Sequence, residues 1–405
     1  MERRTFLKIL SSAGIVSLVS PTFAMEVCKN KVSKSSSALL ESAFRNPPFS
    51  SGVYTWWHWM NGNITKDGIT RDLEAMKANG IAGYQLFEAG SGIPIGPVES
   101  LSDEWVDLIL HTLKESERLG LEFAMHNCPG WSSSGGPWIT PDKAMQIITW
   151  SETKITVGKQ VRIQLPTPKH MFDYYIDTYC LAIPANMKVI PRLSILELSN
   201  RLDKDGVLTW DVPTGEWLIM RFGQTAKDQK NKSAPSKSTG LDCDKFSTEA
   251  LDYHLNCMFK RLMPAMEKIA KHSKIGLLID SYETGDQDWT SDMPAYFEQS
   301  HGYELYPFLP VLANKIVESE ESTKRFLFDF RRVRADMFAE RYYGHFQKRC
   351  KEKGIITYTE PYGGNMMEEL QVAQQLDINM GEFWCGQTVP VSYTHLRAHE
   401  TVLDL

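Results

Sequence analysis

The chain lacks the features that would assign it at once to a specialised class of protein. Its seven cysteines are widely spaced and include no Cys-x-x-Cys pair. This spacing supplies neither a zinc motif nor a disulfide framework, so we expect mostly buried, free thiols. A formal net charge of −6 gives no reason to expect a nucleic-acid surface. The hydrophobic content of 42% and the charged content of 23% describe an ordinary globular protein.

The N-terminal apolar run, Ile9–Val19, is too short to cross a bilayer stably. Arg3 and Arg4 precede it and a small-residue cleavage site ending at Ala24 follows it, which is the order of an export signal. The segment is similar to a twin-arginine signal, and a Sec signal fits nearly as well. We therefore expect a signal peptide at 1–24, a periplasmic or extracellular bacterial protein, and no membrane span.

Short apolar runs that end in polar or aromatic residues recur along the chain, with amphipathic helical segments between them. The six runs are 53–59, 81–88, 121–125, 275–279, 355–359 and 377–380. This alternation is typical of βα units and a parallel sheet. We predict an α/β fold, a (β/α)8 barrel of the TIM type of which about six βα units are present. All strand ends of such a barrel converge on one face.

Residues 149–223 alternate apolar with polar residues between Pro and Gly turns, and a Lys/Ser-rich loop follows. This pattern predicts a small antiparallel β insertion that interrupts the barrel. The predicted segments are a signal peptide at 1–24, a flexible leader at 25–49, three βα units at 50–148, the β-rich insertion with its loop at 149–240, three further βα units at 241–390 and a tail at 391–405.

The tail has a different character from the rest of the chain. Residues 391–401, VSYTHLRAHET, match one reading frame of a common transposase-type sequencing adapter. We expect a gene fragment that runs to about Pro390 and a non-native tail after it; a genuine helical tail is the alternative. A barrel that stops there lacks its last two strands and exposes unpaired backbone. The fragment by itself is then expected to fold poorly or to be inactive.

The stretch Ile275–Thr290 places polar residues directly after a buried apolar run. Asp280 and Glu283 would be costly to desolvate in a core, and the chemistry of α/β folds lies at such strand ends. The structural alternative is that Asp280 caps the next helix and Glu283 is solvated. Other predicted strand ends supply Glu88, Glu360 and Glu382.

Histidines, asparagines and aromatic residues accompany these carboxylates. The histidines and asparagines that end the first and third runs could bind sugar hydroxyls, although a lone histidine is more often structural. The tryptophans either stack on a pyranose ring or pack below the rim. The candidate substrate-binding residues are His58, Trp59, Asn61, Glu88, His126, Asn127, Asp280, Tyr282, Glu360 and Trp384.

Five motifs occur in a fixed order along the chain. They are WWHWMNGNIT (56–65), HNCPGWSSSGGPW (126–138), GLDCDKFS (240–247), DSYETGDQDWT (280–290) and GEFW (381–384). In this order, and over roughly residues 47–384, they resemble glycoside hydrolase family 106, whose members continue into further β-rich domains. The resemblance implies an exported α-L-rhamnosidase that removes terminal α-L-rhamnose from oligo- or polysaccharides, often pectic, by an inverting, calcium-dependent reaction.

The same resemblance implies that Glu283 is the general acid and Glu382 the general base. An inverting glycosidase needs one protonated and one ionised carboxyl group, roughly 6.5–9.5 Å apart. We expect Tyr282 and Trp289 to give Glu283 an apolar neighbourhood that favours its protonated form. Glu360 is the rival for the role of base, and otherwise binds sugar hydroxyls.

Calcium takes several oxygen ligands. Asp280, Glu88 and Asn61 are available, but no spacing singles them out, so the sequence assigns no metal ligand. Two other functions stay open. A barrel glycosidase for another hexopyranoside would use the same two carboxylates, and a truncated fragment could be an inactive sugar-binding protein.

Overall fold

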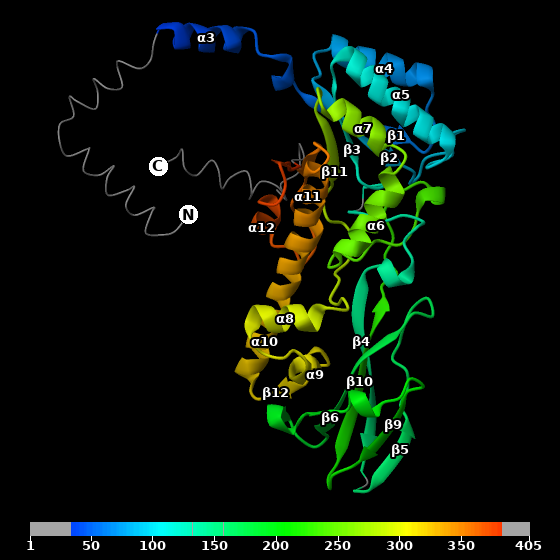
Figure 1. The fold of residues 1–405 in the computed structure, drawn as a ribbon, viewed down its shortest axis with the longest axis vertical. Coiled ribbons are helices and arrows are strands. Elements are labelled where there is room, and N and C mark those ends of the chain that lie inside the picture. Colours follow the sequence, from blue (N-terminus) through cyan, green and yellow to red (C-terminus); the bar gives the residue numbers. More distant parts are fainter. Residues whose placement is uncertain (1–33, 132, 157, 383–405) are drawn as a thin grey trace, which may run out of the picture.

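The computed structural model describes residues 34–382 except 132 and 157 (Figure 1). The expected signal peptide at 1–24, Trp384 and the tail at 391–405 lie outside the described residues. None of the helices within the described ranges combines the length and apolar composition that crossing a membrane requires. The leader predicted to be flexible contains a helix, α3 (Lys34–Arg45), whose last turn carries an ion pair between Arg45 and Glu41.

Six parallel strands form the central sheet. They are β1 (Tyr54–Met60), β2 (Gly83–Ala89), β3 (Glu122–His126), β11 (Ile275–Ile279), β13 (Ile356–Thr359) and β14 (Ile378–Asn379). Their order in the sheet is their order in the chain, and all neighbours are parallel. The six predicted strands and their parallel pairing are confirmed. In the part of the chain that the structure describes, β1 and β14 are the two edges of an open sheet, and the truncated barrel stays a prediction.

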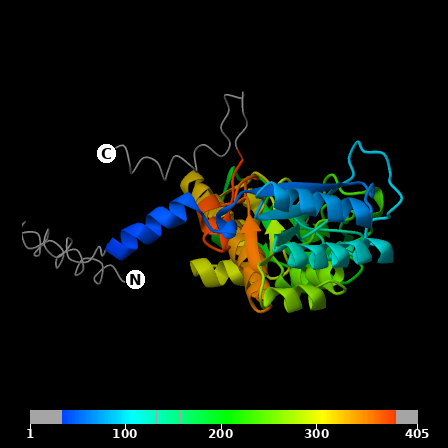
Figure 2. The same cartoon turned by 90° about the horizontal axis from the view of Figure 1, so that it is seen from above.

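Helices alternate with the strands along the chain, and several of them pack on the outer face of this sheet. The main ones are α4 (Lys66–Ala78), α5 (Asp103–Leu119), α6 (Thr248–Phe259), α7 (Met263–Ala270), α10 (Glu320–Met337) and α11 (His345–Lys351); shorter ones are α8 (Met293–His301), α9 (Leu309–Leu312) and α12 (Glu369–Ala373). Helix α5 shows why they form at these positions. Ser102 caps its first turn by accepting from the Trp105 N–H, and Gly120 ends it with a φ of 65°. Helices α4, α5 and α7 follow one another along the sheet (Figures 1 and 2).

The pleat of the strands separates two hydrophobic clusters. On β2, Tyr84 and Leu86 belong to the large core under the helices, whereas Phe87 belongs to a small cluster on the opposite, inner face. Leu278 and Tyr358 extend this inner cluster across β11 and β13. Gly276 makes room for the Tyr358 ring, because a Cβ at that position would lie 2.4 Å from Tyr358 Cε2.

An antiparallel β module separates β3 from β11 in the chain and extends away from the sheet in Figure 1. Its larger sheet has the order β4 (Gln146–Ile155), β10 (Trp217–Ala226), β6 (Ile176–Pro184) and β8 (Leu196–Glu197), and β5 (Gln160–Gln164) pairs with β9 (Val207–Asp211). The module has a hydrophobic cluster of its own. A short parallel pair, β7 (Val189–Ile190) with β12 (Ile316–Val317), joins it to the segment that precedes α10.

A long helical stretch precedes β13, and a π-helical segment interrupts it. Phe338–Gly344 has π-helical geometry between α10 and α11 and buries Phe338, Tyr342 and Tyr343. Segments of this kind are rare and widen the helix locally. Here the inserted rings pack below the loop that follows β11, since Phe338 lies 5.0 Å from the Tyr282 ring.

Candidate active site

Two buried carboxyl groups lie side by side at the carboxyl ends of β11 and β13. The register pairs Leu278 with Tyr358 and Ile279 with Thr359, so that Asp280 and Glu360 come next on adjacent strands. Asp280 and Glu360 also point to the inner face, because they follow Leu278 and Tyr358 by two residues. Their residues are only 3% and 2% exposed. The predicted convergence of strand ends therefore holds for this pair.

Burial and proximity govern the protonation of this pair. Burial, and then the nearby charge of Glu360, raise the pKa of Asp280 to about 9. Burial also raises the pKa of Glu360. The Tyr362 hydroxyl, which donates to Glu360 Oε2 at 2.6 Å, partly opposes this rise. Burial and the neighbouring charge thus favour the protonated form of Asp280. Asp280 Oδ1 has no hydrogen-bond partner among the described residues.

His126 and His58 lie on the same inner face. His126 Nε2 accepts from the Asp280 N–H at 3.3 Å, and its Nδ1 donates to the Cys128 carbonyl at 2.8 Å. Burial lowers the pKa of His126 to about 4, so it is neutral and fixes the start of the loop after β11. The His126 ring stacks on the Phe87 ring at 5.1 Å, and the ring of His58, which is more exposed, lies 5.5 Å from the Phe87 ring.

Glu283 lies in a different environment from the apolar one that the sequence suggested. Its side chain is 40% exposed, with Lys232 Nζ 3.8 Å from Oε2 and the Ser281 hydroxyl 3.5 Å from Oε1. Tyr282 is turned into the core, where its hydroxyl donates to the Gly285 carbonyl at 2.8 Å, and Trp289 is fully buried. The expected apolar neighbourhood is therefore wrong, because Tyr282 and Trp289 are buried in the core whereas the Glu283 carboxyl group is partly exposed beside Lys232.

Glu382 is half-buried at the end of the described chain, directly after β14. Its charge raises the pKa values of both Glu360 and Tyr362, and the charge of Glu283 contributes to the raised pKa of Asp280. Interactions of this kind require short separations. The structure therefore brings Glu283, Asp280, Glu360 and Glu382 together along three adjacent strand ends.

Other predicted site residues lie away from this group. Trp59 and Glu88 occupy the helix-covered face, by the same pleat that places His58 and Phe87 on the inner face. Glu88 accepts from the Ser100 hydroxyl at 2.7 Å, and burial raises its pKa to about 7. These two residues support the fold rather than line the inner face.

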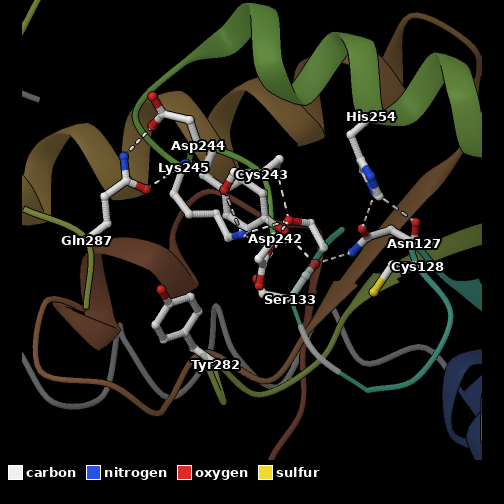
Figure 3. A network of polar contacts seen from close by, with 12 residues as sticks. Asn127, Cys128, Ser133, Asp242, Cys243, Asp244, Lys245, His254, Tyr282 and Gln287 are labelled. Atoms are coloured by element: carbon white, nitrogen blue, oxygen red, sulfur yellow. Dashed lines mark hydrogen bonds and ion pairs between the residues drawn. The ribbon is translucent and has the colours of Figure 1, made fainter. Parts of the chain in front are cut away.

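Two predicted asparagines hold loops in place. The Asn61 side chain donates to the Ile93 carbonyl at 2.7 Å, and the backbone of Asn61 has a φ of 50°, which asparagine tolerates better than most residues. Asn127 is fully buried and donates to the carbonyls of Ser133 and Leu278. His254 Nε2 in turn contacts Asn127 (Figure 3). Both side chains therefore use their donors on the protein backbone.

The dependence on calcium stays a prediction. The described residues contain no group of three or more His, Cys, Asp or Glu side chains that could hold a metal ion. Of the three ligands that the sequence offered, Glu88 accepts from Ser100, Asn61 donates to Ile93, and Asp280 Oδ1 has no hydrogen-bond partner among the described residues. The cysteines within the described ranges form no disulfide, and Cys180, Cys243 and Cys350 are buried.

Sequence reasoning missed Lys232 and Tyr362. Lys232 belongs to the Lys/Ser-rich loop, which folds back over the rim: the Gly130 backbone, with a φ of 81°, passes so close to the Lys232 carbonyl that a Cβ would collide with it. Tyr362 follows Glu360 by two residues, a spacing that could have suggested contact. The return of the loop could not be inferred, because it depends on the fold of the β module.

Two cavities of the described chain are lined by other residues than these four carboxyl groups. One of about 400 Å³ lies on the outer face between α7 and α11, lined by residues such as Phe259, Met263 and Leu277. Another of about 300 Å³ is lined by His58, Trp59 and residues of α4. The buried pair Asp280 and Glu360 instead lies at the carboxyl ends of β11 and β13.

A model of glycoside hydrolase family 106, described as alpha-L-rhamnosidase, matches residues 45–175 and 169–400. A protein of Formosa agariphila named "Putative beta-glucuronidase" is 41% identical over 378 residues, which are 86% of this chain and 32% of that protein. The chain thus spans about a third of that relative's length. A structure titled "Structure of Rhamnosidase from Novosphingobium sp. PP1Y" has a TM-score of 0.76 and 23% identity, over 83% of this chain and 49% of that one. At this identity the likeness shows a shared fold.

Proposed function

This chain belongs to glycoside hydrolase family 106, and on that premise we propose that it carries the acid–base site of an inverting exo-α-L-rhamnosidase. Membership makes it part of a glycoside hydrolase; the sugar and the stereochemistry are our proposal. The observation that carries it is the meeting of Glu283, Asp280, Glu360 and Glu382 at three adjacent strand ends. Glycoside hydrolysis needs two carboxyl groups with different protonation states.

Glu283 is assigned as the general acid. Its exposed side chain stands at the rim, where a leaving group can reach it, and it can donate a proton to the glycosidic oxygen. Glu382 is assigned as the general base, which removes a proton from the attacking water. Glu360 is less suited to that role, because it is 2% exposed and already accepts from the Tyr362 hydroxyl.

The buried pair between these two residues is assigned to the sugar. Asp280, held protonated beside Glu360, offers a hydrogen-bond donor and a free oxygen, and Glu360 offers acceptors. Together they suit the hydroxyls of a pyranose ring, and His58 lies on the same face. Water would attack from the Glu382 side while Glu283 protonates the leaving oxygen, which inverts the anomeric configuration.

Hydrolysis of 4-nitrophenyl α-L-rhamnoside by the full-length protein tests this assignment. Glu283→Gln and Glu382→Gln should each lose about 10²–10⁴-fold in kcat. Azide should not restore the activity of Glu283→Gln by forming a glycosyl azide of retained configuration. Proton NMR should show that the β-anomer of the released sugar forms first. Full activity of either variant, or first formation of the α-anomer, contradicts the corresponding part of the proposal.

A second candidate is hydrolysis of a uronide. The relative from Formosa agariphila is named for glucuronide hydrolysis, and Lys232 Nζ lies 3.8 Å from Glu283, where an ammonium group could bind a sugar carboxylate. 4-Nitrophenyl β-D-glucuronide assayed in parallel separates the two. Turnover of the glucuronide without turnover of the rhamnoside would retain the glycosidase and reject our sugar.

We also propose that residues 1–24 direct export of the protein from the bacterial cytoplasm. Large glycans are accessible outside the cytoplasm. The mass of the mature protein recovered from the periplasm or medium tests this, because cleavage after Ala24 removes the corresponding segment. Full-length protein retained in the cytoplasm would contradict it.

A further inference from the structure

The loop that carries Glu283 is fastened at its far end to the segment 240–247, one of the five sequence motifs (Figure 3). Gln287 Nε2 donates to Asp244 Oδ1, and the Lys245 N–H donates to Gln287 Oε1 at 3.0 Å. The Thr290 hydroxyl donates to the other Asp244 oxygen at 2.8 Å. Gln287 and Asp244 are 0% and 4% exposed. We call these contacts the Asp244–Gln287 clamp.

The clamp rests on a buried ion pair. The Lys245 ammonium group, with no exposed side-chain surface, donates to Asp242 Oδ1, to Ser134 Oγ at 2.7 Å and to the Cys243 carbonyl at 3.1 Å. The Ser134 hydroxyl donates to the same Asp242 oxygen. A buried ammonium group with all three donors used has little freedom to move. The loop after β3 and the segment 240–247 therefore form one fixed support.

The near end of the Glu283 loop is fixed independently. The Asp280 N–H is bound by His126, and the Tyr282 N–H donates to the Tyr362 carbonyl at 2.9 Å. Residues 283–286 are the span between this end and Gln287. Because both ends of so short a span are held, its backbone conformation depends on each of them.

The Glu283 side chain, in contrast, is held weakly. Its closest polar neighbours are Lys232 and Ser281, at 3.8 and 3.5 Å, and its side chain is 40% exposed. A general acid must come within about 2.6–3.2 Å of the oxygen that it protonates. The position of its carboxyl group must therefore be set mainly through the backbone.

We propose that the Asp244–Gln287 clamp positions Glu283 for proton donation to the leaving group. The proposal rests on the proposed function, in which Glu283 is the general acid. Asp244 and Gln287 are positioning residues, because they act through the loop and not on the substrate. Misplacement of a catalytic group by about 1 Å can cost about 10²-fold in rate. Loss of the clamp should therefore impair proton donation specifically.

Two substrates distinguish positioning from general structural support. The first substrate is 2,4-dinitrophenyl α-L-rhamnoside, whose leaving group departs with little protonation of the glycosidic oxygen. The second is 4-methoxyphenyl α-L-rhamnoside, whose leaving group needs the general acid. Variants are assayed in the full-length protein. Gln287→Glu places a carboxylate against Asp244 in nearly the same volume. Asp244→Asn combined with Gln287→Glu reverses donor and acceptor and restores an amide–carboxylate pair.

Gln287→Glu should lose about 10–100-fold in kcat on the 4-methoxyphenyl substrate and less than about 3-fold on the dinitrophenyl substrate, with KM little changed. The double variant should recover most of this loss. Gln224→Glu is the matched control, since Gln224 is 4% exposed and donates to the Tyr174 hydroxyl in the β module. It should leave the ratio of the two substrates unchanged. Glu283→Gln should show the same selectivity as Gln287→Glu, but larger.

Equal losses of kcat by Gln287→Glu on both substrates would overturn the positioning role of the clamp. A double variant that folds like the wild type by circular dichroism but does not recover activity would also overturn it. In either case, selective loss by Glu283→Gln would leave the proposed function standing. No selectivity in Glu283→Gln itself would overturn both.

Discussion

Glu88 provides a direct test of the electrostatics of the fold, because it is a buried carboxyl group that forms no ion pair with any described residue. Burial raises its pKa to about 7 in the folded protein, from 4.5 in an exposed glutamate. Below pH 4.5 the folded and unfolded states both hold the proton. Between pH 4.5 and 7 the unfolded state loses its proton and the folded state keeps it. The free energy of unfolding therefore falls as the pH rises through this window, and the change levels off above pH 7.

Glu88→Gln removes this loss while it preserves the shape of the side chain. The difference between the two pKa values, at about 1.4 kcal/mol for each pH unit, corresponds to roughly 3 kcal/mol. A glutamine oxygen can still accept from the Ser100 hydroxyl, which now donates to the carboxyl group at 2.7 Å. The variant should match the wild type near pH 4.5 and exceed its free energy of unfolding by up to about 3 kcal/mol at pH 8.

Urea unfolding followed by tryptophan fluorescence at pH 4.5 and pH 8 measures this difference. Glu216→Gln, in the exposed turn before β10, is the control and should show no such pH dependence. A Glu88→Gln variant with the same stability difference at both pH values would refute the reasoning. A variant that is less stable at pH 8 would show that Glu88 is ionised and stabilised by a partner.

Two further substitutions test the packing and the buried charges. Lys245→Met removes the cation from the buried Asp242 carboxylate and should lower the free energy of unfolding by about 3–5 kcal/mol, whereas Lys143→Met, in the more exposed pair with Asp142, should change it by less than about 1 kcal/mol. Equal losses in chemical denaturation would contradict the burial of Lys245. Gly276→Ala places a Cβ 2.4 Å from the Tyr358 ring and should cost about 1–3 kcal/mol; an unchanged denaturation midpoint would show that the ring moves aside freely.

The strands of the sheet were predictable because each is a short apolar run bounded by turn residues. All six, and the antiparallel pairing of the module, follow from periodicity alone. The sorting of the strand ends could also have been derived: Trp59 and Glu88 share the parity of the helix-covered residues, whereas His58 has the parity of the inner face. Treating every strand end as part of one site ignored this alternation.

Long-range returns of the chain could not be derived in this way. Lys245 and Lys232 occur in polar segments that look solvated, yet one is fully buried and the other reaches Glu283. The support of Lys245 includes Ser134, which is 111 residues away in sequence. Local propensity contains no information on such a partner. The exposure of Glu283 depends on the same tertiary contacts, which is why the expected apolar neighbourhood was wrong.

The β module also has a consequence for how this chain reaches its folded state. Asn127 and Leu278, which are hydrogen-bonded across the central sheet, are 151 residues apart in sequence. The antiparallel pairing of β4 with β10 brings Gln146 next to Ala226, and the module has a hydrophobic cluster of its own. If the module forms first, the loop that must close when β3 meets β11 becomes much shorter. The entropic cost of closing a loop is smaller for a shorter loop.

We therefore expect the module to fold before β3 and β11 meet. Pulsed hydrogen exchange during refolding should protect the amides of β4 and β10 earlier than those of β11; simultaneous protection would contradict this order. An insertion that looks like an interruption of the central sheet would then act kinetically as the step that lets its two halves join.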